Sequence, residues 1–409
     1  MLDNKQGHFD GLEVRSADQR AAEQLEALNT QLARVRAVGD SCLPDGGALK
    51  AKSELAELPV LRKSRLVEWQ AARPPFGGMA VSNVTHVFQS PGPIYEPGGI
   101  GHDWWRMGRF LHAVGIGAGD IVQNCFGYHL TPAGMMFESG ARAVGAAVLP
   151  AGVGQTELQV RAARDIGCTA YAGTPDYLKV ILDKADEMGE VLRFTRAVVG
   201  GGALFPSLRA EYADRGVVCL QCYATADLGN IAYESPNPDA PASPPEGMIL
   251  DEGVIVEIVR PGTGDPVADG EVGEVVVTSL NPDYPLIRFA TGDLSAILPG
   301  QSPCGRTNIR INGWMGRADQ TTKIKGMFVR PEQVADFVAK TGMLKARVIA
   351  RREDERDVML VQVEGEGGDP SALAEAVKAT MKLNGRVEVV TKGSLPNDGK
   401  VIDDQRSYT

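Results

Sequence analysis

Apolar residues recur along the chain at two spacings, one typical of helices and the other of strands. Near the start, the segment EQLEALNTQLARVRAV (23–38) carries apolar residues at helical spacing, namely Leu25, Leu28, Leu32 and Val35. From about residue 118, short apolar runs alternate with helix-like segments such as TPAGMMFESGARAVG and TPDYLKVILDKADEMG. The predicted strands are GDIVQNC, AAVLP, CTAYAG, RAVVGG and VVCLQCY. Strands that alternate with helices are typical of right-handed β-α-β crossovers, so we expect a mostly parallel sheet.

The pattern changes after this α/β region. A proline-rich segment, SPNPDAPASPPEG (235–247), predicts a surface loop. The runs GVIVEIV and GEVVVTSL that follow it are rich in β-branched residues and predict a small antiparallel β unit.

The C-terminal segment predicts a compact β-α-β-β-α-β unit. Its parts are KIKGMFV, PEQVADFVAKTG, ARVIAR, DVMLVQV, PSALAEAVKATMKLNG and RVEVVT. The apolar faces of its two helices are formed by Val334, Phe337 and Val338, and by Leu373, Val377 and Met381. The sequence therefore predicts an α/β protein with two domains. A large N-terminal domain, 1–317, has mostly parallel sheets plus the small β unit, and a small C-terminal domain, 318–409, is α+β.

Charge and composition narrow the class of function. The 409 residues carry a formal net charge of −10 without a visible Lys/Arg run. A nucleic-acid partner is therefore not expected, because neutralising phosphates requires a basic surface. No apolar stretch reaches roughly 18 residues, and the N-terminus lacks an apolar signal core. We expect a cytoplasmic protein without a membrane partner that acts on small molecules.

The six cysteines are too sparse for a disulfide scaffold and suit a reducing compartment. Cys219 and Cys222 form a CxxC within the apolar run VVCLQCY, where strand alternation would place the two thiols on opposite faces of the sheet. We interpret them as buried strand cysteines. The five histidines show no spacing typical of a metal site.

The most specific chemical pattern is FATGDL (289–294), followed by GRADQTTKIKGMFVRPEQV (316–334). Asp293 lies on a tight Thr-Gly turn, and its carboxylate can accept hydrogen bonds from two ribose hydroxyls. Taken alone, the same residues fit an ordinary Asx-type turn that caps a strand equally well.

Together, the motifs resemble a known family. RFATGDL, GRADQTTKIKG and LPNDGK (395–400) are similar, in this order, to the motifs of the adenylate-forming (AMP-binding) acyl- and aryl-CoA synthetases. Within that superfamily the chain resembles phenylacetate-CoA ligase over nearly its whole length. The further matching stretches are LAELPVLRKSRL, FGYHLTPAGMMFESGARAVGAAVLPAGVGQT, TPDYL, YPLIRFATGDL and CGRT.

The resemblance implies ATP, AMP and CoA as ligands and assigns a set of residues to the nucleotide. Tyr223 would stack on adenine, Asp293 would hold the ribose, and Arg317 would lie beside the ribose at the hinge. The implied nucleotide-binding residues are Ser90, Gly92, Gly201, Gly202, Ala203, Tyr223, Ala224, Thr225, Asp293 and Arg317.

The resemblance also implies a mobile C-terminal domain with a catalytic lysine. Lys400 would reach the α-phosphate, where a positioned ammonium offsets the negative charge that builds as a carboxylate attacks. Asp319 would be the pivot of a rotation that withdraws this lysine. After the rotation, Lys323, Lys325 and Gly326 would approach the channel used by the CoA thiol.

The predicted phosphate loop, VFQSPGPIYEPGG (87–99), departs from the family pattern, which is rich in Ser, Thr and Gly with a Lys. Pro91 and Pro93 each lack an N–H, and Glu96 is expected to place a negative charge beside a polyanion. Asp227, in YATAD, stands where the family has a magnesium-binding Glu. The resemblance makes it a candidate Mg²⁺ ligand, and no further metal is expected.

The acyl pocket of relatives is built from the regions that match NCFGYHLTPAG and GGALFP. The candidates are Tyr128, His129, Leu130, Ala133 and Phe205. An aromatic wall fits an aryl or arylacetic acid, whereas His129 in place of a glycine indicates a different or more polar acid. Tyr128 and His129 also fit as ordinary residues at the end of a parallel strand.

Two functional hypotheses follow. The first is an ATP-dependent ligase that joins an aromatic, phenylacetate-like acid to CoA, with Lys400 catalytic and a homodimer possible. The second is a degenerate relative that binds a nucleotide, CoA or an acyl adenylate as a partial-reaction enzyme or sensor. The altered phosphate loop favours the second hypothesis, and the retained Lys400 favours the first.

Overall fold

The computed structural model describes residues 7–38, 43–90, 93–202, 204–239, 243–318, 320–325, 327–353, 356–365, 368–396 and 400–406. The chain divides into two compact units. Unit 1 comprises Met1–Val256, Val277–Phe289 and Leu298–Gly313, and unit 2 comprises Glu257–Val276, Ala290–Ile297 and Trp314–Thr409. The predicted domain boundary after Arg317 stays a prediction.

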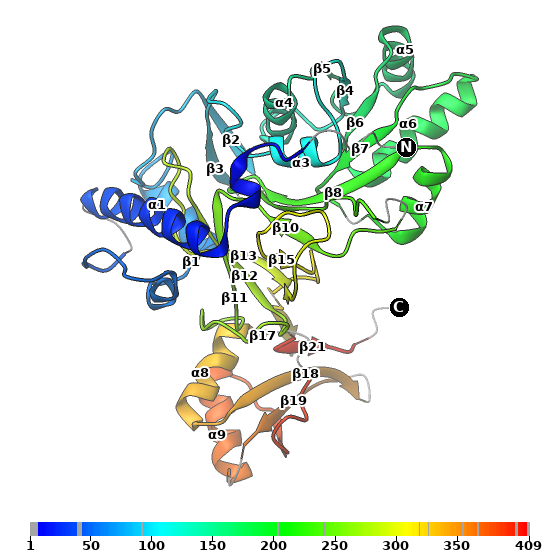
Figure 1. Ribbon diagram of the computed structural model, residues 1–409. Coiled ribbons are helices and arrows are strands. Elements are labelled where there is room, and N and C mark those ends of the chain that lie inside the picture. The colour runs from blue at the N-terminus through cyan, green and yellow to red at the C-terminus, as the bar shows by residue number, and fades with distance from the viewer. Residues whose placement is uncertain are drawn as a thin grey trace. The chain divides into compact units, whose positions relative to one another are not determined.

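Unit 1 is built around a nine-stranded sheet with the order β14-β15-β10-β9-β8-β7-β6-β4-β5, in which β14 is Ile297–Leu298 (Figure 1). Its parallel part runs from β5 to β8, and every strand predicted from an apolar run is present. The strands are β4 (Ile121–Asn124), β5 (Ala147–Pro150), β6 (Ala170–Gly173), β7 (Arg196–Val199) and β8 (Val218–Thr225). The intervening helices are α4 (Ala133–Ala143), α5 (Thr156–Ile166), α6 (Pro175–Met188) and α7 (Pro206–Asp214).

The other half of this sheet is antiparallel, which corrects the prediction of a mostly parallel sheet. β9 (Gly229–Tyr233) pairs with β8, β10 (Met248–Leu250) pairs with β9, and β15 (Arg310–Ile311) pairs with β10. Between β8 and β9 lie three residues, and a connection that short allows a hairpin but no parallel crossover. The fold is α/β with a large mixed sheet.

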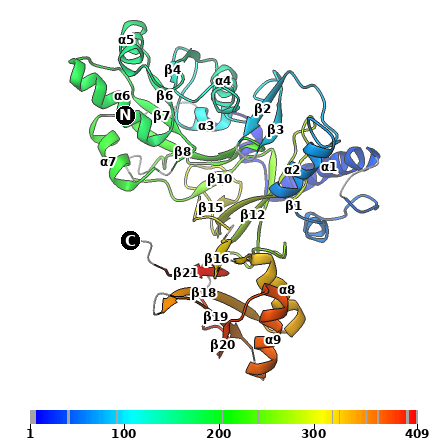
Figure 2. The same ribbon diagram turned by 180° about the vertical axis from the view of Figure 1, so that it is seen from behind.

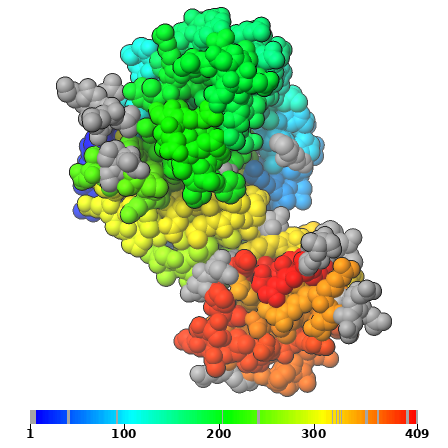
Figure 3. All heavy atoms as spheres, turned by 90° about the vertical axis from the view of Figure 1, so that its right-hand side faces the viewer, coloured from blue at the N-terminus to red at the C-terminus, as the bar shows by residue number. Residues whose placement is uncertain are grey.

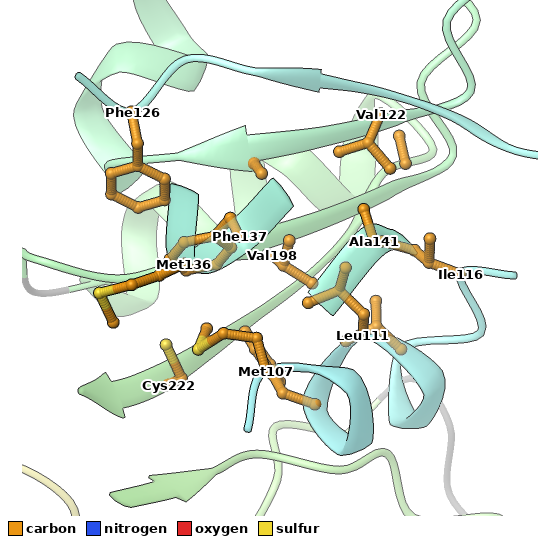
Figure 4. Close-up of a cluster of buried hydrophobic side chains, with 14 of the residues drawn as sticks. Met107, Leu111, Ile116, Val122, Phe126, Met136, Phe137, Ala141, Val198 and Cys222 are labelled. Atoms are coloured by element: carbon orange, nitrogen blue, oxygen red, sulfur yellow. The ribbon is translucent and has the colours of Figure 1, made fainter. Parts of the chain in front are cut away.

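Apolar clusters cover the parallel part of the sheet on both faces. One cluster contains Leu111 of α3 (Gly108–Ala113), Met107 directly before α3, and Met136 and Phe137 of α4 (Figure 4). The other contains residues of α5, α6 and α7, among them Val160, Leu178, Ile181 and Tyr212. Cys222 belongs to the first cluster and Cys219 to the second. The two thiols therefore lie on opposite faces of β8, as predicted, and both are buried and unbonded.

The N-terminal region packs on unit 1 through the predicted helix. This helix is α1 (Ala17–Ala37), which starts where the Ser16 side chain accepts a hydrogen bond from the Gln19 N–H. Its apolar side, with Leu28 and Leu32, joins a buried cluster that also contains Leu55 and Ile255. At the start of the helix, Glu252 accepts from the Arg15 guanidinium at 2.7 Å and from Arg20 at 2.8 Å.

A short segment after α1 carries α2 (Lys63–Ala72), which lies beside β1 (Leu61–Arg62) and the hairpin of β2 (His86–Ser90) and β3 (Ile94–Gly98), as Figure 2 shows. β1 belongs to a four-stranded sheet of order β1-β13-β12-β11. Its other strands are β11 (Val254–Val259), β12 (Gly273–Ser279) and β13 (Phe289–Ser295), which confirms the predicted β unit after the proline-rich loop.

Unit 2 contains the predicted C-terminal β-α-β-β-α-β pattern. Its elements are β16 (Thr322–Ile324), β17 (Met327–Val329), α8 (Pro331–Thr341), β18 (Lys345–Glu353), β19 (Arg356–Glu364), α9 (Pro370–Met381), β20 (Arg386–Val390) and β21 (Ile402–Asp404). The sheet order is β20-β19-β18-β21. The predicted helix faces, including Phe337 and Val377, are buried against it. These elements are coloured orange to red in Figure 3.

Among the helices of the described ranges, none combines the length and the apolar character that crossing a membrane requires.

The Glu252 cluster yields a stability prediction. Glu252→Gln leaves the buried Arg15 and Arg20 without their shared carboxylate, and breaking a buried pair costs about 3–5 kcal/mol. We expect the free energy of unfolding in urea to fall by that order. Glu26→Gln, at an exposed position of α1, is the matched control and should change it by less than about 0.5 kcal/mol. Equal stabilities of the two variants would contradict the prediction.

Candidate functional site

The predicted phosphate loop is a β-hairpin in this chain. β2 and β3 pair in antiparallel register, with Phe88 opposite Glu96. Gln70 of α2 anchors β3 by donating to the Tyr95 carbonyl at 2.7 Å and accepting from the Tyr95 N–H at 2.8 Å. Because these bonds hold the hairpin against α2, residues of α2 and β3 occupy fixed positions relative to each other.

A buried ion pair lies where α2 meets the turn between β8 and β9. Lys63 Nζ is 2.8 Å from Asp227 Oδ2, and the Asp227 side chain is 0% exposed whereas that of Lys63 is 40% exposed. The Lys63 ammonium also lies 5.8 Å from the centre of the Phe289 ring, at the start of β13. The carboxylate is thus held inside the protein, and its cation faces the surface.

Glu96 is the second carboxyl group of this cluster and is 1% exposed. Burial raises the pKa of Glu96 to about 7, and the nearby Asp227 adds to the shift, while Ser90 and Lys63 oppose it. The expected full negative charge beside the phosphates is therefore corrected, because the group is buried and is about half protonated at neutral pH. Burial and the two carboxylates also raise the pKa of Tyr284 well above its usual value.

Most of the other residues of unit 1 that the resemblance assigns to the nucleotide lie at the ends of β7 and β8. Tyr223 is 8% exposed, and Ala224 and Thr225, half-buried, end β8 after an irregularity in its pairing with β9. Gly201 and Gly202 follow β7 and are exposed. Ser90, at the end of β2, is buried. Gly92 and Ala203 lie outside the described residues.

Unit 2 contains the predicted ribose carboxylate. Asp293 accepts from Arg317 Nη1 at 2.8 Å and from Trp314 Nε1 at 3.1 Å. Gly292, at φ +74°, makes this approach possible, since a Cβ there would lie 2.8 Å from Arg317 Nη2. A carboxylate can accept about four hydrogen bonds, which is the chemistry that ribose hydroxyls require. The two residues that sequence reasoning paired are brought together.

Lys400 lies in unit 2 beside a cavity of about 230 Å³. Its Nζ is 3.6 Å from Asp403 Oδ1, and its carbonyl accepts from Arg347 Nε at 2.9 Å. The Gln320 side chain fixes the following strand by accepting from the N–H groups of Val401 and Ile402. The cavity is walled by apolar residues of α8 and by Lys345 and Lys400.

The predicted hinge and CoA-side residues are described in part. Lys325 is exposed with φ +48°, and its N–H donates to Asp357 Oδ2 at 3.3 Å. Asp319, Gly326 and the side chain of Lys323 lie outside the described residues. Their roles stay predictions.

The acyl-pocket candidates lie between β4 and α4, at the start of α4 and directly before α7. Asn124 Nδ2 donates to the Tyr128 hydroxyl at 2.8 Å, and burial raises the Tyr128 pKa. His129 is exposed, and Ala133 packs against the core at the start of α4. Leu130 and Phe205 are 69% and 64% exposed. The Leu130 carbonyl accepts from the Gln89 N–H, so this loop contacts the hairpin.

A magnesium ion does not fit at Asp227. Its carboxylate already holds the Lys63 ammonium at 2.8 Å and has a side chain buried from solvent. Hard cations take roughly six oxygen ligands and keep water among them, which a position filled by an ammonium does not provide. Within the described ranges, no three His, Cys, Asp or Glu side chains gather in a way that could hold a metal ion.

Sequence reasoning missed three contributors to these sites. Lys63 lies in the stretch LAELPVLRKSRL, which carried the family resemblance but received no chemical role. Trp314 precedes the GRADQ motif and donates to Asp293, and Gln320 is the last residue of that motif and accepts from the strand after Lys400. The signal available for all three was their position within or beside a recognised motif.

Comparisons with known proteins agree with the family resemblance that the sequence motifs indicated. Residues 106–281 match the family model described as AMP-binding enzyme. The chain is 29% identical to phenylacetate-coenzyme A ligase of Aromatoleum evansii over 381 residues, covering 88% of this chain and 84% of that protein. It is 29% identical to the Escherichia coli K12 enzyme of the same name, with 85% of each chain covered.

Solved structures show the same fold. Crystal structures of 2-hydroxyisobutyryl-CoA ligase match at TM-scores of 0.67 and 0.68 with 23% identity. One contains 2-HIB-AMP and CoA in the thioesterification state and covers 97% of this chain and 92% of its own. The other contains 2-HIB-AMP in the postadenylation state.

The buried Glu96 predicts a pH dependence. The folded protein keeps Glu96 protonated up to about pH 7, whereas the unfolded chain ionises it near pH 4.5. Since the unfolded chain binds fewer protons between these values, Glu96 lowers stability as the pH rises from about 4.5 to 7. Glu96→Gln should remove this loss. The difference in free energy of unfolding between the variant and the wild type should therefore be roughly 1–3 kcal/mol larger at pH 8 than at pH 5.

Urea unfolding of both proteins at these two pH values measures the difference. Glu68→Gln, which removes a carboxyl from the exposed side of α2, is the matched control. A Glu96→Gln variant with the same pH dependence as the wild type would contradict the assignment.

Proposed function

We propose that this chain, which belongs to the AMP-binding superfamily of adenylate-forming acyl-CoA ligases and has phenylacetate-CoA ligases as homologues, is an ATP-dependent ligase for an aromatic, phenylacetate-like acid. The observation that carries the proposal is the 29% identity over 88% of the chain to a phenylacetate-CoA ligase. The pairing of Asp293 with Arg317 supports it, because these residues come from the two motifs that the resemblance assigns to the ribose.

The first half-reaction forms an acyl adenylate. A carboxylate oxygen of the acid attacks the α-phosphorus of ATP, and pyrophosphate leaves with the electrons of the broken P–O bond. In this chain Asp293 would accept from the ribose hydroxyls and Tyr223 would contact adenine. Lys400 would stabilise the charge on the α-phosphate oxygens.

The second half-reaction transfers the acyl group to CoA. The thiol sulfur attacks the acyl carbon, AMP leaves, and the thiol proton passes to solvent. Rotation of the C-terminal region about Asp319 would withdraw Lys400 and bring Lys323, Lys325 and Gly326 toward the thiol. One nucleotide-binding region would thus serve two reactions in sequence.

The aromatic acid is inferred from the candidate pocket residues. Tyr128 offers a ring after the end of β4, and Leu130 and Phe205 offer apolar surface that is exposed in this structure. The exposed His129 would favour a polar substituent on the acid. We therefore expect arylacetic and hydroxylated aryl acids to be the first substrates to test.

A second function, nucleotide or acyl-adenylate binding without complete catalysis, is favoured by the hairpin β2–β3. The sequence between Ser90 and Ile94 contains Pro91 and Pro93, which offer no N–H to a phosphate. Under this alternative the protein binds AMP or CoA but does not exchange pyrophosphate into ATP with any acid.

Lys400→Ala tests the catalytic lysine. We expect acid-dependent ATP–pyrophosphate exchange to fall by about 100-fold or more, because a charge-stabilising group of the transition state is lost, while the ATP dissociation constant changes less than about threefold. Lys378→Ala, at an exposed position of α9, is the control. Undiminished exchange in Lys400→Ala would remove Lys400 from the chemistry.

Asp293→Asn tests the ribose assignment. The amide keeps one oxygen for Trp314 but loses the charge and acceptors needed by two hydroxyls, so AMP binding should weaken by roughly 10-fold or more. Calorimetry with AMP and with inorganic pyrophosphate separates ribose contacts from phosphate contacts. Unchanged AMP affinity would refute the assignment.

A further inference from the structure

Two segments of unit 1 that the proposed function assigns to the nucleotide, the β2–β3 hairpin and the turn after β8, lie around one lysine, and Phe289 of unit 1 lies beside it. Lys63 Nζ contacts Asp227 at the end of YATAD and faces the ring of Phe289, where the FATGDL strand begins. Glu96 of the hairpin is electrostatically coupled to both Lys63 and Asp227. The ammonium therefore lies at the junction of the altered phosphate loop with the turn after β8.

The exposed fractions of the Lys63 and Asp227 side chains indicate which of the two can face a ligand. Asp227 has a side chain with 0% exposure, and Lys63 retains 40%. An ammonium carries three N–H donors, more than one ion pair to a carboxylate requires. The buried Asp227 holds the lysine in place, and the outward side of the ammonium remains able to meet an anion.

The backbone around Lys63 is anchored on both sides. Lys63 is the first residue of α2, directly after β1, whose Leu61 N–H donates to the Arg288 carbonyl at 2.9 Å. Two turns further along the helix, Gln70 is bonded to Tyr95 of the hairpin. The charge is therefore presented from a fixed position, which lowers the entropy lost when an anion binds.

The sequence of the predicted phosphate loop is poor in groups that bind a phosphate. Pro91 and Pro93 remove two N–H donors, and the carboxyl of Glu96 attracts no anion. Asp227, the position at which the family resemblance placed magnesium, is occupied by the ammonium. A single point charge is a suitable phosphate ligand, because lysine binds phosphate without the planar geometry that arginine imposes.

We propose that Lys63 is the cation that contacts the nucleotide phosphates in this chain, and that Asp227 positions this ammonium instead of binding magnesium. The inference rests on the proposed function, since that function places the nucleotide at these motifs. It assigns a phosphate-binding role to a residue of α2 and a positioning role to Asp227.

The test is calorimetric titration of the full chain with ATP and with adenosine, each in EDTA and in excess magnesium. In Lys63→Met we expect ATP to bind at least tenfold more weakly in EDTA, with adenosine affinity changed less than twofold. Lys63→Arg keeps the charge and should restore most of the ATP affinity. Arg65→Met removes a positive charge from the exposed side of the same helix and is the matched control.

The outcomes separate the inference from the proposed function. ATP affinity unchanged in Lys63→Met, or ATP and adenosine weakened equally, would overturn the phosphate role. Asp227→Asn should leave the effect of magnesium on ATP binding as in the wild type, and loss of that effect would overturn the positioning role. A wild-type protein that binds neither ATP nor adenosine would instead refute the proposed function on which the inference rests.

If Lys63→Met does not fold, Lys63→Arg and Asp227→Asn carry the test. Each variant is used only if it shows a cooperative melting transition like that of the wild type, which indicates that it is folded. ATP affinity within threefold of wild type in Lys63→Arg, with the magnesium effect retained in Asp227→Asn, supports the inference. A tenfold loss of ATP affinity in Lys63→Arg or a lost magnesium effect in Asp227→Asn contradicts it.

Discussion

A buried carboxylate must have a cation close to it, and this constraint organises much of the described chain. Removing a charge from water costs several kcal/mol unless a partner of opposite sign and hydrogen bonds replace the lost hydration. Glu252 meets the requirement with two arginines of the N-terminal region, and Asp251 meets it with Arg106 and Arg109. Because the partners come from distant parts of the sequence, the Glu252 pairs hold the N-terminal region on the rest of unit 1, and the Asp251 pairs hold the segment around α3 there.

The same constraint acts on two carboxyl groups of the candidate site, Asp227 and Glu96, but among the described residues only Asp227 has a cation in contact with it. Asp227 has Lys63 at 2.8 Å, so it can remain charged while its side chain is buried. Glu96 lies close by without an ion pair of its own among the described contacts, and burial accordingly moves its pKa to about 7. The cluster is closest to neutral when Glu96 is protonated. Lys63 then balances Asp227 alone, and the junction of hairpin, helix and turn carries no excess negative charge toward a nucleotide as long as Glu96 is protonated.

The altered loop changes how a phosphate would be held in this chain. A glycine-rich loop binds phosphate through many backbone N–H groups, each contributing a modest hydrogen bond. The backbone of β2 and β3 is committed to pairing of these two strands, and the sequence between them contains two prolines. In the proposed arrangement, one side-chain cation on α2 takes the place of many N–H donors. Its attraction for a phosphate depends on the salt concentration and on its ion pair with Asp227.

The sequence by itself determined the elements, because local periodicity and turn chemistry are properties of neighbouring residues. The strands from β4 to β8, the helix faces of α8 and α9 and the opposed thiols of Cys219 and Cys222 were all predicted. The motif series also identified the superfamily and paired Asp293 with Arg317. The antiparallel half of the large sheet was not predicted, since the direction of pairing depends on the turn that closes β8 onto β9.

Tertiary structure decided what each charge does. Glu96 and Asp227 lie 131 positions apart in the sequence (227 − 96), and Lys63 is in a third segment, so no local pattern could show that they share one cation. Whether a carboxylate binds a metal, repels a phosphate or stays protonated depends on burial and on its nearest partner. Both quantities arise from packing between distant segments, which is why the sequence named the residues but the fold assigned their electrostatic roles.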